Sequence, residues 1–377
     1  MKLGIDQISE YQELFTNKRV GLITNPTGLN SDFVSSIDIL NEQTSLRALF
    51  APEHGIRGEL QAGVHLDDYV DSKTNIPVFS LYGKNKKPSK EMMDLIDILV
   101  FDIQDVGSRF YTYIYTMAYA MEACKEHHKT MVILDRPNPL GTKVEGTILD
   151  LTYRSFVGYY PITERYGLTI GELALLFNNE FDIHCDLEII PLKDYDRRLD
   201  YIDLNIPFIM PSPNIPTPLT TYAYLSTCFF EGTNMSEGRG TTKPFFIVGS
   251  PFMNVTEVLN KLKEFDLPGV TFRSLYFTPT FSKWQGENCQ GIELIITDKK
   301  VYEPVKTGYI LFDIIKNTHK EFEVLPPFKE GRPHFLDFLN GNDFLRTSRI
   351  PLEEQLKLLV DNSKEFTKVK RRYHLYE

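Results

Sequence analysis

The sequence is poor in cysteine and tryptophan. It contains four cysteines and one tryptophan among 377 residues, and Cys124, Cys185, Cys228 and Cys289 form no CxxC pair. Cysteines so widely spaced in a chain of this length indicate neither a disulfide framework nor a zinc site. Free cysteines are usually buried, so we expect four buried thiols.

Long apolar runs are also missing. No segment approaches the roughly 20 apolar residues of a transmembrane helix, and residues 1–6 show no apolar signal-peptide core. This pattern predicts a cytoplasmic protein. A secreted or periplasmic protein whose signal segment had been removed would have the same sequence, so that alternative stays open.

Blocks of basic residues are absent. The 51 acidic residues outnumber the 41 basic ones and give a formal net charge of −10. An acidic chain without a Lys/Arg block disfavours nucleic acid and anionic membranes as partners. The hydrophobic fraction of 42% and the charged fraction of 24% are typical of a soluble globular protein, and the length predicts two or three domains.

Several motifs of known chemistry are missing as well. The chain has no P-loop, no GxGxxG after its first predicted strand, no HExxH, no GxSxG and no EF-hand spacing. Nucleotide, zincin, serine-hydrolase and calcium chemistry therefore have little support from the sequence.

The first part of the chain alternates apolar strand-like segments with helical patterns. Continuous apolar strands that alternate with helices predict a doubly wound parallel sheet, and we assign a Rossmann-like α/β domain to residues 1–150. The predicted strands are 19–25, 46–50, 76–83, 96–103 and 130–134, and the helices between them include 90–95 and 111–126.

The rest of the chain predicts a mixed organisation. Thr169 and Glu172 have the spacing of a capping box at the start of a helix. The proline-rich segment 211–218 predicts an extended loop that either crosses between domains or lines a cleft. We expect residues 151–240 to continue the first domain with crossing loops, and residues 241–377 to form a smaller α+β domain. Further predicted elements are strands at 187–192 and 291–298 and helices at 255–263, 308–316 and 350–363.

Acidic residues follow three of the predicted strands. They are Glu53, Asp105 and Asp135. Ligands bind at the carboxyl ends of parallel strands, so we expect these residues to share one site. Several carboxylates at one cleft suit acid–base catalysis or a metal site. Asp102 lies inside its strand, and we expect it to be a structural acid of the sheet.

Each candidate also has a structural interpretation. Glu53 has the position of a helix cap. Arg109 begins a helix, where it suits anion binding but equally suits an ion pair with Asp105 or Asp135. Asp135 either orients a water or pairs with Arg136. The glycine-rich segment 231–242 could cradle phosphate with its backbone amides.

Five segments together resemble a known family. They are 51–58, 101–113, 135–139, 211–217 and 231–242. In order and spacing they are similar to the NamZ-type exo-β-N-acetylmuramidases, a bacterial family formerly catalogued as a domain of unknown function. The resemblance runs from about Gly4 to Tyr376.

The resemblance implies a glycoside hydrolase that removes non-reducing terminal N-acetylmuramic acid from peptidoglycan fragments without a metal or other cofactor. It also implies a Rossmann-like domain joined to a smaller C-terminal domain, with the active site between them. Glu53 becomes the leading catalytic acid, and Asp105, Asp135, Glu231 and Glu237 compete for the role of second carboxylate. The expected substrate-binding residues are His54, Arg109, Tyr111, Asn138, Asn214, Glu231, Glu237 and Arg239.

Arg109 and Arg239 are the candidates to bind the lactyl carboxylate that distinguishes N-acetylmuramic acid from N-acetylglucosamine. Two other functions remain as alternatives. One is a phosphosugar or nucleotide-sugar enzyme that holds phosphate near Arg109 and the 231–242 segment. The other is a non-catalytic cell-wall sugar-binding protein, which is disfavoured because converging carboxylates cost desolvation that a binder need not incur.

Overall fold

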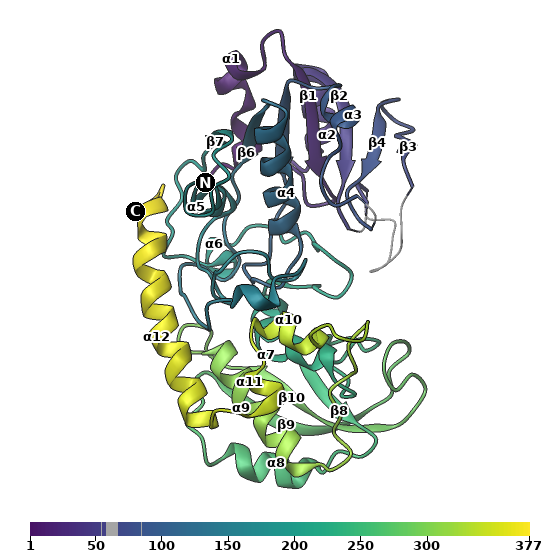
Figure 1. Cartoon of the computed structure of the whole chain (residues 1–377), viewed down its shortest axis with the longest axis vertical. Helices are drawn as coiled ribbons and strands as arrows, with labels where there is room; N and C mark the ends of the chain where they lie inside the picture. Colours follow the sequence, from purple (N-terminus) through teal and green to yellow (C-terminus); the bar gives the residue numbers. More distant parts are fainter. Residues whose placement is uncertain (54, 58–66, 84) are drawn as a thin grey trace.

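The computed structural model describes residues 1–53, 55–57, 67–83 and 85–377. The chain forms two lobes that meet at a junction (Figure 1). The large-sheet lobe contains a seven-stranded, mostly parallel sheet, and the small-sheet lobe contains a three-stranded antiparallel sheet. The α/β class with a smaller C-terminal α+β part is therefore confirmed.

The large sheet has the order β3-β4-β2-β1-β5-β6-β7. All neighbours pair in parallel except β3, which is antiparallel to β4. The five predicted strands are confirmed, and the strand predicted at 187–192 is β7 of the same sheet. The strands are β1 (Arg19–Thr24), β2 (Ser45–Ala51), β3 (Tyr69–Val70), β4 (Pro77–Ser80), β5 (Ile98–Asp102), β6 (Thr130–Leu134) and β7 (Asp186–Ile190).

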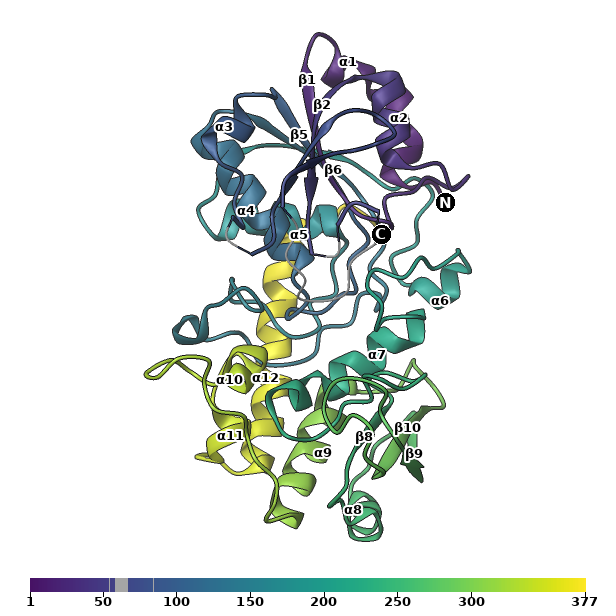
Figure 2. The ribbon, with the colours of Figure 1, turned by 90° about the vertical axis from the view of Figure 1, so that its right-hand side faces the viewer.

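Helices cover both faces of this sheet. Figure 2 shows α2 on one face and α3 and α4 on the other. This arrangement explains why β5 is buried along its whole length and reads as an unbroken apolar run. The first elements and the helices of this lobe are η1 (Gly4–Tyr11), α1 (Gln12–Phe15), α2 (Ser36–Gln43), α3 (Lys90–Met93), α4 (Tyr113–Glu126), η2 (Leu151–Tyr153) and α5 (Ile170–Glu180).

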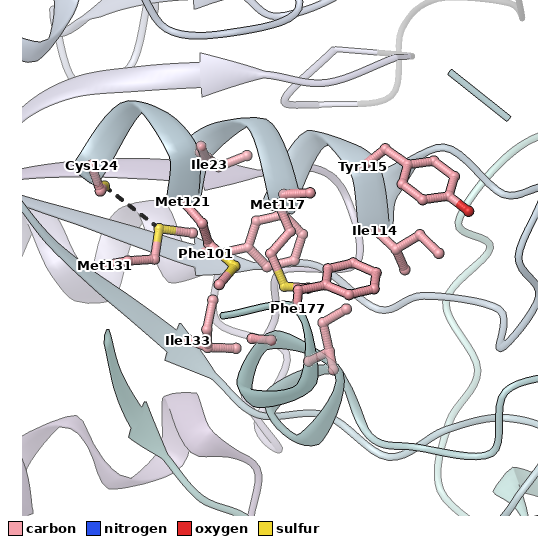
Figure 3. Close-up of a cluster of buried hydrophobic side chains, with 14 of the residues drawn as sticks. Ile23, Phe101, Ile114, Tyr115, Met117, Met121, Cys124, Met131, Ile133 and Phe177 are labelled. Atoms are coloured by element: carbon pink, nitrogen blue, oxygen red, sulfur yellow. Dashed lines mark hydrogen bonds between the residues drawn. The ribbon is translucent and has the colours of Figure 1, made fainter. Parts of the chain in front are cut away.

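One hydrophobic core of the large-sheet lobe lies between the sheet, α4 and α5, and a second lies on the other face of the sheet, against η1 and α2. Ile23 and Phe101 of the sheet pack against Met117 and Met121 of α4 and Phe177 of α5 (Figure 3).

The Thr169 hydroxyl accepts from the Glu172 amide, and the Glu172 carboxylate accepts from the Thr169 amide. The predicted capping box at the start of α5 is therefore confirmed.

The small-sheet lobe has the strand order β8-β10-β9, with antiparallel pairing throughout. Its strands are β8 (Ile247–Ser250), β9 (Val270–Phe277) and β10 (Cys289–Ile296). The other elements from residue 201 onward are α6 (Tyr201–Leu204), α7 (Pro218–Thr227), η3 (Cys228–Gly232), α8 (Val255–Leu262), α9 (Pro304–Thr318), α10 (Phe335–Asn340), α11 (Phe344–Thr347), α12 (Leu352–Lys370) and η4 (Arg371–Tyr373).

Helix α12 runs along both lobes (Figure 1). In its first part, Leu359 is buried in the core of the small-sheet lobe, and Leu352 and Leu356 are partly buried against that core. In its last part, Phe366 is buried in the core of the large-sheet lobe, and Val369 is partly buried against that core. One helix therefore connects two hydrophobic cores.

Three smaller expectations can be compared with the structure. The four cysteines are free and buried, as expected. Across the described ranges, no helix combines the length and the apolarity needed to cross a membrane. The domain bounds at residues 150 and 240 stay a prediction.

Candidate active site

A pocket of about 270 Å³ lies where the two lobes meet. The large-sheet lobe contributes Glu53, Tyr82 and the segment 110–113. The small-sheet lobe contributes Glu231, Arg239, Phe335 and others, and Ser212 and Asn214 come from the proline-rich loop. That loop therefore lines the pocket, which was one of the two interpretations of its sequence.

Glu53 is brought to the pocket by the end of β2. The chain turns directly after the strand, where the Gly55 amide donates to the Pro52 carbonyl at 3.2 Å and Gly55 has a φ of 79°. A residue with a side chain is strained at such a φ, so glycine suits this turn. The turn leaves the Glu53 side chain at the edge of the sheet, within the pocket lining.

Hydroxyl groups surround the Glu53 carboxylate. The Thr112 hydroxyl donates to Glu53 Oε2 at 3.3 Å. The Tyr82 hydroxyl also bonds to Glu53, and burial together with the nearby carboxylate raises the pKa of Tyr82 to about 12. The Tyr113 hydroxyl lies 3.5 Å from the Glu53 carbonyl oxygen. Neutral donors thus fix the orientation of this carboxyl group.

Glu231 enters the pocket from η3 of the small-sheet lobe. Its Oε1 atom lies 2.7 Å from the Arg239 guanidinium, which is also 3.3 Å from Glu237. The Lys283 ammonium lies 2.7 Å from Glu237. Burial lowers the pKa of Arg239, but the two carboxylates outweigh it and raise that pKa above its ordinary range. The result is a chain of four alternating charges with Glu231 at its pocket end.

Asp105 lies behind the pocket and is not among the described residues that line it. Its side chain is buried, accepts from the Gly107 amide at 2.7 Å and bonds to the Tyr166 hydroxyl. Burial raises the pKa of Asp105 to about 6 despite these donors. Tyr111, by contrast, lines the pocket, and its pKa is raised by burial and by neighbouring groups that include Asp105 and Glu53.

Arg109 is buried away from the pocket lining. Its guanidinium lies 3.1 Å from Glu164, so Glu164 is its ion-pair partner rather than Asp105 or Asp135. It also donates to the backbone carbonyls of Thr147, Ile162, Leu339 and Asn340 at 2.8 to 3.2 Å. The last two carbonyls belong to α10, so this side chain links the two lobes.

Asp135 and Asn138 also have structural partners. Asp135 is fully buried, and it accepts from the amides of Arg136 and Gly171 and from the hydroxyls of Thr169 and Tyr376. Burial raises its pKa to about 7. The Arg136 side chain pairs with Asp102 at 2.7 Å, which confirms Asp102 as a structural acid. Asn138 donates to the Leu168 carbonyl at 2.8 Å.

The pocket therefore brings together five of the predicted site residues. A sixth, Glu237, is not in the described lining but forms an ion pair with Arg239, which is. The five are Glu53, Tyr111, Asn214, Glu231 and Arg239. His54 lies outside the described residues. Asp105, Arg109, Asp135 and Asn138 are not in the described lining.

Several lining residues were not predicted as site residues, and they differ in the signal they leave in the sequence. Tyr82 follows the end of β4, and Thr112 and Tyr113 directly follow the predicted Tyr111, so strand ends and chain proximity could have suggested all three. Phe156 and Phe335 come from loops and helix starts without a local motif, and only the fold brings them here.

Within the part of the chain that is described, no group of three or more His, Cys, Asp or Glu is placed to hold a metal ion.

Comparison with known proteins gives consistent matches along the whole chain. The family models described as exo-beta-N-acetylmuramidase NamZ match residues 20–219 with their N-terminal part and residues 222–376 with their C-terminal part. The chain is 49% identical over 384 residues to the peptidoglycan beta-N-acetylmuramidase NamZ of Bacillus subtilis (strain 168), covering all of this chain and 91% of that protein.

Two solved structures of DUF1343 family proteins from Bacteroides fragilis NCTC 9343 have the same fold. Their TM-scores are 0.90 and 0.80, with sequence identities of 36% and 33%. Each comparison covers 100% of this chain and 99% of the other.

Proposed function

This chain belongs to the NamZ family of exo-β-N-acetylmuramidases, and we propose that it is a glycoside hydrolase that releases non-reducing terminal N-acetylmuramic acid from peptidoglycan fragments. One observation of the structure supports this activity most directly. Glu53 and Glu231 line one pocket from the two lobes, and glycoside hydrolysis generally uses a pair of carboxyl groups on the two sides of the scissile bond.

We assign Glu53 the role of general acid. Such a group must hold a proton and deliver it to the glycosidic oxygen as the bond breaks. The Thr112 and Tyr82 hydroxyls orient the Glu53 carboxyl group, while the turn after β2 keeps it at the pocket. The positive charge that develops on the sugar ring then needs a carboxylate on the other side.

We assign that second role to Glu231 rather than to Asp105 or Asp135. Glu231 lines the pocket, whereas the other two are buried behind other residues. The Arg239 guanidinium balances the charge of Glu231 and is held in turn by Glu237. These charged side chains orient the Glu231 carboxylate before the substrate binds. A group oriented in advance stabilises the positive charge that develops on the sugar ring best.

Arg239 is our candidate for recognition of the lactyl carboxylate. Its side chain is partly exposed in the pocket and carries five N–H donors, of which Glu231 and Glu237 use only part. Arg109 is not part of this proposal because its buried guanidinium already binds Glu164 and four carbonyls.

The test is release of N-acetylmuramic acid from the disaccharide N-acetylmuramyl-β-1,4-N-acetylglucosamine. We expect the wild-type protein to release it, and Glu53→Gln and Glu231→Gln each to lose roughly 10²- to 10⁴-fold in kcat/KM. Glu188→Gln, an exposed glutamate of β7, is the matched control and should be fully active.

Two results would overturn the proposal. A folded wild-type protein that releases no N-acetylmuramic acid would refute the activity itself. Full activity of Glu53→Gln or Glu231→Gln would keep the activity but remove that residue from the reaction.

A further inference from the structure

The segment that leads into α10 presents a bare aromatic ring beside the pocket. Phe328 is 84% exposed, the largest exposure of any bulky hydrophobic side chain in the described residues. Its ring centroid lies 5.5 Å from that of Phe335, with the rings tilted by 59°. Phe335 in turn lines the pocket, so the two rings lead from the pocket to the solvent.

This segment is attached to the small-sheet lobe ahead of Phe328, and its two ends are joined to each other. The Leu325 amide donates to the Gly232 carbonyl at 2.9 Å, and the His334 Nδ1 atom bonds to the Leu325 carbonyl at 2.8 Å. A turn between Lys329 and Arg332 closes with a bond of 3.1 Å. Both views show the segment running along the small-sheet lobe up to the junction of the lobes (Figures 1 and 2).

The pocket is too small for the whole of an oligosaccharide. Its volume of about 270 Å³ is slightly below the range of roughly 300–1,000 Å³ that is usual for ligand sites, and therefore suits one amino sugar. An exo-acting hydrolase holds the terminal sugar in such a pocket, and the next sugar must lie at its mouth. The C–H face of a pyranose ring packs well on an aromatic face, which is apolar and carries partial negative charge.

We propose that Phe328, supported by Phe335, forms an aromatic platform for the second sugar ring of the substrate, the one that leaves when the bond is cut. This inference rests on the proposed hydrolase function. It adds a binding site for the leaving sugar to a pocket that holds the terminal one. The platform lies in the small-sheet lobe, on the same lobe as Glu231 and Arg239.

Single exposed hydrophobic side chains are common on protein surfaces and usually need no function. Phe328 differs because its neighbour Phe335 belongs to the pocket lining. Tyr276 of β9 is 71% exposed on the same lobe and is absent from the described lining, which makes it the matched control.

The experiment compares two substrates that differ only in the leaving group. The first is the disaccharide of N-acetylmuramic acid and N-acetylglucosamine. The second is N-acetyl-β-muramyl fluoride, whose leaving group is one atom and cannot reach the platform. We expect Phe328→Ala to lower kcat/KM for the disaccharide roughly 3- to 10-fold, mainly through KM, and to leave the fluoride unchanged. Phe328→Tyr should behave as wild type on both, and so should Tyr276→Ala.

The outcomes separate this inference from the function it rests on. If wild-type protein hydrolyses neither substrate, the hydrolase proposal fails. If wild type hydrolyses both and Phe328→Ala loses nothing on the disaccharide, or loses equally on the two substrates, the platform is refuted while the hydrolase proposal stands.

Discussion

Arg109 and Arg239 have the same side chain but very different surroundings. Arg109 is fully buried and binds Glu164 and carbonyls of both lobes. Arg239 keeps part of its side chain open to the pocket and pairs with Glu231 and Glu237. From the sequence, both residues were candidates to bind the lactyl carboxylate, so substituting each of them separates a structural role from substrate recognition.

We predict that Arg239→Ala changes the ratio of activities on N-acetylmuramyl and N-acetylglucosaminyl substrates by roughly tenfold or more, because a charged hydrogen bond to the lactyl carboxylate is lost. Arg109→Ala should keep that ratio in whatever protein remains folded. It should instead lower the free energy of unfolding by about 3–5 kcal/mol, since Glu164 is left as an unpaired buried charge.

The measurements are kcat/KM on both sugars and urea unfolding. Arg198→Ala is the control. Among the described residues, the side chain of Arg198 pairs with Asp196 alone, at the surface, so its loss should change neither quantity appreciably. An unchanged sugar ratio in Arg239→Ala would contradict lactyl recognition by this residue.

At the scale of elements, the connection between β6 and α5 contains a buried carboxyl group. Asp135 follows β6 and accepts hydrogen bonds from Thr169 and Gly171 at the start of α5 and from Tyr376 near the C-terminus. These bonds join a strand, a helix and the tail of the chain. The helix start itself is stabilised by the capping box of Thr169 and Glu172.

We predict a dependence of stability on pH from this carboxyl group. Burial raises the folded-state pKa of Asp135 from an ordinary value of 3.8 to about 7. The folded protein therefore binds this proton more tightly than the unfolded chain. This proton stabilises the folded state in full below about pH 4, and the stabilisation is lost as the pH rises to about 7. The loss lowers the free energy of unfolding by roughly 4 kcal/mol at most.

The test is to compare unfolding of wild type and Asp135→Asn by urea between pH 4 and pH 8. Asparagine keeps the shape but has no proton to lose, so the advantage of wild type over the variant should shrink as the pH rises. Lys370 and His374 have pKa values lowered by burial and are present in both proteins, so their contributions cancel in the difference. Parallel curves for the two proteins would contradict the prediction.

Elements also differ in how well the sequence predicts them. The central strands β1, β5 and β6 are buried along nearly their whole length because helices cover both faces of the sheet. The five strands expected in the first domain and the one expected at 187–192 are all present. Strand β9 was not expected. Its residues are exposed or only partly buried along its length, so it lacks the hydrophobic pattern that marks a strand, and its pairing with β10 defines it instead.

At the scale of the whole molecule, α12 connects the two lobes. Leu359 is buried in the core of the small-sheet lobe and Phe366 in that of the large-sheet lobe. The catalytic pair we propose is divided between the same two lobes. The distance between Glu53 and Glu231 therefore depends on how the lobes are held together. Helix α12 and the hydrogen bonds from Arg109 to α10 both connect them.

We predict that the wild-type protein unfolds in a single calorimetric transition, because the lobes share α12 and the buried Arg109 network. The substitution Phe366→Ala should lower the free energy of unfolding by about 3–5 kcal/mol, because it leaves a cavity in the core of the large-sheet lobe. Val360→Ala, at an exposed position of the same helix, should stay within about 0.5 kcal/mol. Two separate transitions in wild type would show that the lobes are energetically independent.

The sequence by itself determined the alternation of buried strands and helices, the capped start of α5, the four buried thiols and the family. These follow from local composition and from patterns of a few neighbouring residues, which the chain carries whatever its fold. It also placed Glu53 at a strand end, because a strand and its turn are local features.

Only the tertiary structure decided which of the predicted polar residues share the pocket. Asp105, Asp135 and Glu53 all follow strands in the sequence, yet two are buried behind the lining and one is in it. Glu231 and Phe335 share a pocket with Glu53 only because the second lobe packs against the first. The burial of a side chain and its hydrogen-bond partners depend on residues far apart in the chain, so no local sequence pattern predicts them.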